Sequence, residues 1–255
     1  MRFGDVSFSV ASHAAWLAGI DSPEAWQRWT NGELSADGSG EPAVKSMPPM
    51  LRRRASAAAK FALETAYQCL PATENIPVVF ASRHGECARS VELLQELAAR
   101  LPLSPTSFSL SVHNASAGLL SIARREQGNS IAIAAGRSTV EHGVIEACGL
   151  LADGAPQVLL VAFDGPLPEQ FDAYRDCHEQ AYGWAWLMQA EQTEPQQQRI
   201  SLSWHAPDTA KIDTAAASQT EADGLAVLRF FLRGEQADTL SRQVDGRCWN
   251  WSVHA

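Results

Sequence analysis

Apolar and polar positions along the chain follow two periods, one typical of strands and one typical of helices. Residues 131–135 form a continuous apolar run, which is typical of a strand buried on both faces. The run stops at Gly136, and the S-x-x-E pattern of Ser138 and Glu141 predicts a capping box that opens a helix. That helix keeps one apolar stripe, and residues 158–163 predict a second buried strand. The centre of the sequence therefore predicts a strand, a sharp turn, a helix and a parallel strand.

The flanking segments predict further strands and helices. Before the central unit, we expect strands at 6–11 and 76–81, an extended segment at 106–111, and helices at 23–29, 51–70, 88–101 and 117–125. After it, we expect a loop at 166–176, strands at 183–189, 200–204 and 248–253, an irregular connection at 207–220 and one helix at 221–242. Strands that alternate with helices imply a mostly parallel sheet with helices on its faces.

Composition and charge narrow the class of protein. A length of 255 residues fits one large α/β domain or two small ones. The net charge of −9 argues against nonspecific binding of nucleic acids, which requires a basic surface. The five cysteines are scattered and form no C-x-x-C pair, so reduced thiols are expected rather than a zinc ribbon or a disulfide framework. No leader pattern and no window of membrane-spanning character occurs, and we therefore expect a cytoplasmic protein without metal or cofactor.

The turn between the central strand and its helix is the first candidate for chemistry. In many α/β enzymes such a turn presents a nucleophile beside free backbone N–H groups. Here the turn carries Gly136, which has no side chain to react. Glycine is also the usual residue at a turn that needs a positive φ, so the geometry of the turn is expected to survive without the chemistry.

Several short motifs occur in the order and spacing of a known family. W-x-x-W-x-x-G lies at residues 26–32, A-S-R-H-G at 81–85, and S-F-S-L-S-V-H-N-A-S-A-G at 107–118, before the strand and turn at 129–144. Together they resemble the N-terminal half of the β-ketoacyl synthases, which belong to the thiolase-fold superfamily. The third motif lacks the proline that the family carries, and the similarity covers roughly residues 4–205.

The resemblance implies an α/β fold of the half thiolase-like type. A mixed sheet with helices on its faces is expected over residues 1–205, and a short α+β C-terminal extension over 206–255 is expected to pack on the same domain. By the family's motif, Gly136 stands at the position of the catalytic cysteine, so no acyl thioester forms there. The two histidines and the lysine of a ketosynthase's second half also have no counterpart. The chain is therefore expected not to be an enzyme by itself.

A ketosynthase-like chain without the cysteine resembles the chain-length factors, and its short form resembles the subunit found with aryl polyene synthases. This implies a heterodimer or higher heteromer with a catalytic β-ketoacyl synthase, whose acyl tunnel the chain helps to shape in polyene, polyketide or fatty-acid-type biosynthesis. Acyl carrier protein would be a transient partner. Two alternatives stay open: a stand-alone thiolase-like acyltransferase or hydrolase with another nucleophile, and a scaffold that binds a carrier protein.

By the same resemblance, the strand leading into the turn lies at the edge of its half-sheet and pairs with its counterpart across the dimer two-fold. The expected interface and tunnel residues are Ile131, Ala132, Ile133, Ala134, Ala135, Gly136, Arg137, His84, His113 and Asn114. His84 has a second interpretation, as a histidine hydrogen-bonded at a strand end, and Asn114 as a residue that fixes the backbone of its turn.

Two further clusters have both a structural and a functional interpretation. Arg52, Arg53 and Arg54 form a basic run, which is either a solvated helix end or a docking patch for an acidic carrier protein. Trp249 and Trp251 lie on one face of the last strand, where they form either the edge of the core or an interface plug.

Overall fold

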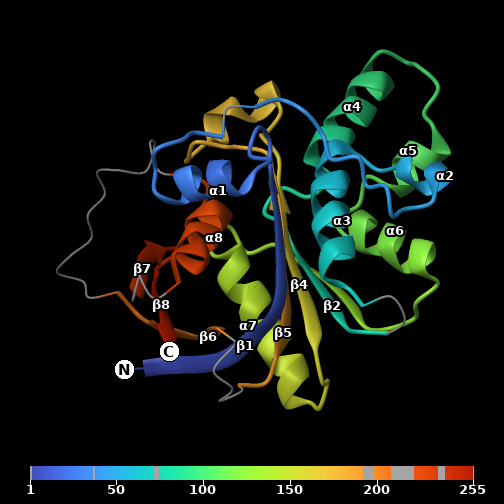
Figure 1. Cartoon of the computed structure of the whole chain (residues 1–255). Helices are drawn as coiled ribbons and strands as arrows, with labels where there is room; N and C mark the ends of the chain where they lie inside the picture. Colours follow the sequence, from blue (N-terminus) through green and yellow to red (C-terminus); the bar gives the residue numbers. More distant parts are fainter. Residues whose placement is uncertain are drawn as a thin grey trace.

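The computed structural model describes residues 2–36, 38–71, 75–191, 198–207, 221–234 and 239–254 (Figure 1). Within these residues, one eight-stranded sheet has the order β3-β2-β4-β5-β1-β6-β8-β7. The strands are β1 (Arg2–Leu17), β2 (Val78–Ala81), β3 (Ser130–Ile133), β4 (Val158–Asp164), β5 (Tyr182–Gln189), β6 (Gln198–His205), β7 (Thr239–Val244) and β8 (Arg247–His254).

The sheet is mixed, as the half thiolase-like fold requires. Among the described strands, the parallel pairs are those of β2 with β3 on one side and with β4 on the other. The remaining pairings among the described strands are antiparallel. The expectation of a mostly parallel sheet is therefore wrong, because β1 and the strands from β5 onward join the sheet through antiparallel pairs rather than crossover helices.

Helices cover both faces of the sheet. They are α1 (Pro23–Thr30), α2 (Pro49–Arg52), α3 (Ala57–Cys69), α4 (Cys87–Ala98), α5 (Pro105–Ser109), α6 (Ala115–Arg124), α7 (Thr139–Ala152), the 3₁₀ helix η1 (Glu169–Tyr174) and α8 (Asp223–Arg233). Figure 1 shows α3 and α6 on one side of the strands and α7 and α8 on the other. None of the described helices is long and apolar enough to cross a membrane.

The central strand β4 divides the core into two halves. Its alternate side chains Val158, Leu160 and Ala162 join the cluster under α7 and α8, and the intervening ones join the cluster under α3 and α6. Both sets are buried, so the prediction of a doubly covered strand is confirmed for β4.

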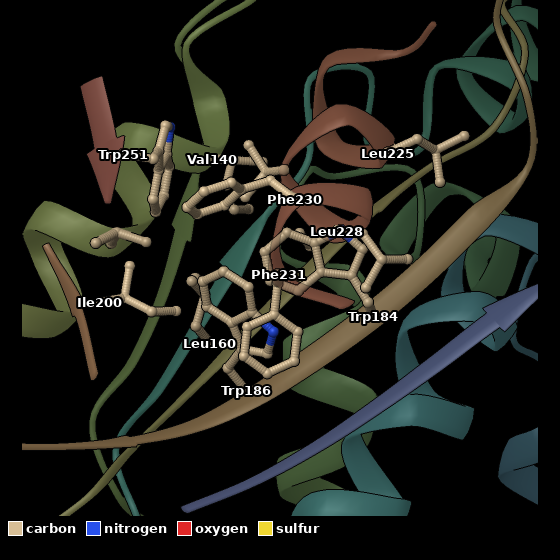
Figure 2. Close-up of a cluster of buried hydrophobic side chains, with 14 of the residues drawn as sticks. Val140, Leu160, Trp184, Trp186, Ile200, Leu225, Leu228, Phe230, Phe231 and Trp251 are labelled. Atoms are coloured by element: carbon tan, nitrogen blue, oxygen red, sulfur yellow. The ribbon is translucent and has the colours of Figure 1, made fainter. Parts of the chain in front are cut away.

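The cluster under α7 and α8 is rich in tryptophan. Figure 2 shows Trp184 and Trp186 of β5 packed with Phe231 of α8 and Trp251 of β8. Trp249 and Trp251 are both 0% exposed, which confirms that one face of the last strand carries them and makes them core residues. The C-terminal helix and strands therefore supply part of the hydrophobic core of this face.

Three local predictions are wrong. The helix expected at 221–242 ends at Arg233, because Gly234 takes a φ of +54° and the chain continues into β7. The segment expected to be extended at 106–111 instead contains α5, whose first turn is capped by Ser104. The helix expected at 51–70 is divided into α2 and α3.

Several boundaries also differ. β1 is longer than predicted and continues to Leu17, and η1 lies in the segment expected to be a loop at 166–176. Apart from Pro207, the connection expected at 207–220 lies outside the described residues.

Candidate functional site

The turn between β3 and α7, which we call the elbow, has the glycine geometry that the sequence predicts. Gly136 has a φ of +57°, a conformation that residues with a side chain rarely adopt. Thr139 closes the turn, since its Oγ1 donates to the carbonyl of Gly136 at 2.7 Å and accepts the N–H of Ala135 at 3.0 Å. The elbow is therefore a tight, hydrogen-bonded turn that leads directly into the first turn of α7.

The capping box predicted from Ser138 and Glu141 is wrong. Ser138 is the N-cap residue of α7, but its hydroxyl makes no capping bond and lies 2.8 Å from Oδ2 of Asp245. The backbone N–H of Ser138 donates to the same carboxylate oxygen at 2.8 Å. Asp245 follows β7, so the N-cap residue of α7 is bonded by a distant part of the chain.

A buried network of charges connects the elbow to the C-terminal segment. Arg242 of β7 lies 2.5 Å from Oε1 of Glu141 and 2.6 Å from Oδ1 of Asp223, and it donates to the carbonyl of Arg137 at 2.9 Å. Arg137 in turn bonds both carboxylate oxygens of Asp223 at 3.0 Å. Glu141 is 0% exposed, and burial raises the pKa of its carboxyl while Arg242 opposes that shift. These contacts fix β7 and α8 against the elbow.

A small cavity lies beside the elbow. Its volume is about 30 Å³, and it is lined by residues 83–84, 136–137, 139–140, 164–165, 177, 179–180, 182 and 222–224. That space is enough for a water molecule or two, so the lining side chains nearly fill it. As formed by the described residues, this cavity is therefore too small for an acyl chain.

Asp164, at the end of β4, organises the loop on the other side of this cavity. Its carboxylate accepts hydrogen bonds from the Ser82 hydroxyl at 2.7 Å and from the backbone N–H groups of Arg83 at 3.0 Å and His84 at 2.9 Å. Burial raises the pKa of Asp164, and His84 together with these hydrogen bonds opposes the shift. The carboxylate therefore fixes the backbone of the 82–84 loop.

The structure brings three of the predicted residues together at the cavity: His84, Gly136 and Arg137. The side chain of His84 is 16% exposed, and its Nε2 lies 3.4 Å from Oε1 of Glu179. His113 and Asn114 are not among the described residues that line the cavity. Instead, Nε2 of His113 lies 2.7 Å from the carbonyl of Ser82.

The edge strand β3 differs from its prediction. Residues 131–133 are half-buried and Ala134 is exposed, so the strand is not buried on both faces. The physical reason is its place in the sheet, because among the described strands it pairs only with β2. Its position at the edge agrees with the expectation from the family resemblance.

The basic run lies at the end of α2. Arg53 and Arg54 are exposed, and Nη2 of Arg89 on α4 donates to the carbonyl of Arg54 at 3.0 Å. Nη1 of Arg52 donates to the carbonyls of Ala43 and Val44 at 3.5 Å. The run therefore belongs to the helical layer that contains α4.

Two other groups near the elbow are poor nucleophiles. Cys177 lines the cavity, but burial raises the pKa of its thiol to about 11, so the thiol is protonated near neutral pH. The Ser138 side chain belongs to a residue that is 1% exposed, and Asp245 already binds its hydroxyl. Neither group has the accessible, activated geometry that nucleophilic catalysis requires.

The residues that the sequence analysis missed are Asp164, Asp223, Arg242 and Asp245. A signal existed for Asp164, because a polar residue directly follows a buried strand. A signal also existed for Asp245, since Asp-Gly between two alternating segments is typical of a hairpin turn. No local pattern indicates that Arg242 or Asp223 reaches the elbow.

The chain matches a known family over most of its length. Residues 26–252 match the family described as β-ketoacyl synthase, N-terminal domain. A comparison with curated protein sequences returns no match.

Solved structures with the same fold include proteins of this family. A chain from the ketosynthase ApeO in complex with its chain length factor ApeC, from Xenorhabdus doucetiae, is 26% identical, with a TM-score of 0.81 over 97% of this chain and 99% of that one. The ishigamide ketosynthase/chain length factor is 13% identical, with a TM-score of 0.65 over 89% and 73%. A β-ketoacyl synthase from Burkholderia phymatum is 13% identical, with a TM-score of 0.57 over 90% and 70%. The fold and the family match agree with each other. The chain therefore belongs to the family of β-ketoacyl synthase N-terminal domains.

Proposed function

We propose that the chain is a non-catalytic, chain-length-factor-like subunit that pairs with a catalytic β-ketoacyl synthase and helps to shape its acyl tunnel. We assign it to polyene biosynthesis of the aryl polyene type, within polyketide and fatty-acid-type chemistry. The similarity to a chain of the ApeO–ApeC complex, over nearly the whole of both chains, supports this proposal.

The observation that carries the proposal is Gly136. A ketosynthase-type condensation needs a nucleophile that carries the acyl group, and by the family's motif that nucleophile would stand at this position. Glycine supplies none, and Cys177 and Ser138 are protonated or buried as described above. An intact elbow without a nucleophile fits a subunit whose partner performs the chemistry.

The surface beside the elbow supports a protein partner. β3 leaves one edge of the sheet unpaired among the described strands, and α6 packs beside it. Large apolar side chains on α4, α5, α6 and the segment before α6 are between 51% and 67% exposed: Leu94, Leu97, Phe108, Val112 and Ile122. Several exposed large apolar side chains, with Ile122 on the helix that packs beside the open sheet edge, favour an interface with another protein.

We assign the partner to this side of the molecule, with β3 pairing across the interface. Ile131, Ala132, Ile133, Ala134 and Ala135 would contact the ketosynthase, and Gly136, Arg137 and His84 would lie beside its acyl pocket. His113 would act through the 82–85 loop, whose carbonyl at Ser82 it contacts.

The exposed guanidinium groups of Arg53 and Arg54, with Arg52, are the proposed docking point for acyl carrier protein. A cationic patch attracts acidic carrier proteins even on a chain whose net charge is −9. Five unpaired cysteines are consistent with our assignment of the complex to the cytoplasm.

The test is co-purification of the chain with a ketosynthase encoded beside it. The native chain is compared with variants that carry a lysine in the edge strand β3. Ala132→Lys and Ala134→Lys place a charge in the proposed contact, and we expect neither variant to co-elute with the ketosynthase in gel filtration. Thr239→Lys is the matched control, because it puts the same charge on β7, the edge strand at the other end of the sheet. The isolated chain should also gain no mass after incubation with acyl carrier protein bearing a thioester.

Two results would contradict the proposal. The first is co-elution of both β3 variants with unchanged affinity, which would put the interface elsewhere. The second is a stoichiometric acyl adduct on the isolated chain that a single substitution removes, which would make the chain an enzyme.

A further inference from the structure

The turn between β7 and β8 reaches across the molecule to the elbow. Asp245 and Gly246 have φ values of +49° and +70°, which is the geometry of a tight Asp-Gly hairpin. The Asp245 carboxylate contacts α7 through its Oδ2, which lies 2.8 Å from both the backbone nitrogen and the hydroxyl oxygen of Ser138. The hairpin therefore ends with a carboxylate on the first turn of α7.

The same carboxylate faces the position where a nucleophile would stand. A Cβ atom added to Gly136 would have three atoms of Asp245 as its nearest neighbours, Oδ2 at 3.0 Å, Oδ1 at 3.2 Å and Cγ at 3.3 Å. Both oxygen distances are tighter than nine in ten real Cβ contacts, so a side chain here would require the carboxylate to move by a few tenths of an ångström. The space on this side of the elbow is already filled from within the chain.

Electrostatics add to this blockage. The N–H groups at the start of a helix attract an anion, and that attraction is what an elbow can offer to a thiolate or an acyl oxyanion. Here the anion is already present, because Ser138 donates to Asp245. A thiolate at position 136 would lose this donor and would lie next to a like charge, which raises the pKa of a thiol.

The hairpin is held in this place by the buried charges. Arg242 precedes the turn by three residues and bonds Glu141 of α7 and the carbonyl of Arg137. The carboxylate is therefore held over the elbow by its own bonds to Ser138 and by the anchor at Arg242 on the strand that precedes the turn.

We propose that Asp245 is a built-in carboxylate that occupies the anion position of α7 and closes the elbow to a thiolate or an acyl group. The blockage of position 136 follows from the geometry alone. Its interpretation as a feature of a non-catalytic subunit rests on the proposed function, in which Gly136 replaces the nucleophile. Restoring a cysteine by a single substitution would then give a hindered, weakly reactive thiol.

The experiment uses a cysteine at the elbow as a reporter. Gly136→Cys is compared with the same variant carrying Asp245→Asn, which keeps the turn and the volume, or Asp245→Gly, which removes the side chain. The rate of alkylation by iodoacetamide is measured from pH 6 to 10, and peptide mapping by mass spectrometry assigns the label to position 136. At pH 7.5 we expect either second substitution to raise the rate by about tenfold, which corresponds to about one pKa unit.

A carboxylate at the far end of α7 provides the control. Asp153→Asn removes the same charge from the C-cap of this helix and should leave the rate unchanged. Equal rates and equal thiol pKa values with and without Asp245 would overturn the proposal.

A second measurement avoids the strain of a cysteine at a positive φ. In the native background, Asp245→Gly leaves the Ser138 amide with only its longer bond to the carbonyl of Ala135, at 3.2 Å. The hydrogen exchange of this amide should therefore become faster, whereas unchanged exchange would overturn the proposal. Failure of either experiment leaves co-elution with the ketosynthase unaffected, so this proposal and the proposed function fail separately.

Discussion

Replacing Arg242 by methionine should destabilise the protein strongly. Methionine keeps the aliphatic bulk but leaves Glu141, which is 0% exposed, without its guanidinium partner. Removing one partner of a buried ion pair typically costs about 3–5 kcal/mol. For a chain of this size, 1 kcal/mol corresponds to roughly 2–4 °C in Tm, so we expect a loss of roughly 6–20 °C.

The loss should depend on pH. Burial raises the pKa of Glu141 above its value in the unfolded chain, and removing Arg242 takes away the main opposing influence. The folded state then binds more protons than the unfolded state between the two pKa values, so stability falls as the pH rises through the folded pKa. Arg242→Met should therefore differ less from the native protein at pH 5.5 than at pH 8.

Urea denaturation at both pH values measures this effect, with Glu141→Gln combined with Arg242→Met as the control. Glutamine removes the buried charge and keeps an acceptor for Nε1 of Trp251, which lies 3.3 Å from Oε1 of Glu141. The double variant should recover a large part of the stability and lose the pH dependence. The reasoning is refuted if Arg242→Met costs less than about 1 kcal/mol, well below the range for a buried pair, or the same amount at both pH values.

Two further predictions concern the core. Deleting residues 221–255 should give an insoluble or aggregated protein, because α8 and β8 fill the tryptophan-rich cluster; a soluble, folded monomer from this truncation would count against their covering role. Burial raises the pKa values of Cys69 and Cys148 to about 12, so neither thiol should be alkylated in the folded protein at pH 8, and both should be alkylated in urea. Mass spectrometry of the labelled peptides reads out the second prediction, and rapid native labelling of either thiol would contradict it.

The central part of the fold could be predicted because its signals are local. The apolar run of β4 gives a doubly buried strand, and Gly136 gives a turn with positive φ, within a few residues in each case. For β3 the same kind of apolar run gave a wrong prediction of burial on both faces. A continuous apolar segment does not indicate whether the strand has one neighbour in the sheet or two. Its half-exposed state depends on the strand order of the whole sheet.

Other errors arose where the amino-acid composition of a segment was given more weight than a local signal for the end or the start of a helix. Gly234 marks the end of α8, and residues 239–243 alternate between exposed and half-buried positions as a strand does. Ser104 followed by Pro105 is a helix start, although the segment after it is short and rich in serine.

The site was less predictable than the fold, because its contacts are not local. Ser138 and Glu141 fit the spacing of a capping box, yet their partners Asp245 and Arg242 lie 107 and 101 residues further along the chain. A motif fixes the positions of residues on one helix and says nothing of which distant strand reaches them. The grouping of His84 with Gly136 came from the family resemblance, and their role at a partner's pocket remains a prediction.

The position of β1 in the sheet has a consequence for synthesis of the chain. The first strand lies between β5 and β6, so both of its hydrogen-bonded neighbours are made much later. At typical translation rates, the ribosome needs roughly 10–40 s to extend the chain from β1 to the end of β6. During that interval, Phe8 and Leu17 of β1 have no finished core to enter. The sheet can therefore close only after most of the chain has left the ribosome, and the nascent N-terminal segment must be kept from aggregating until then.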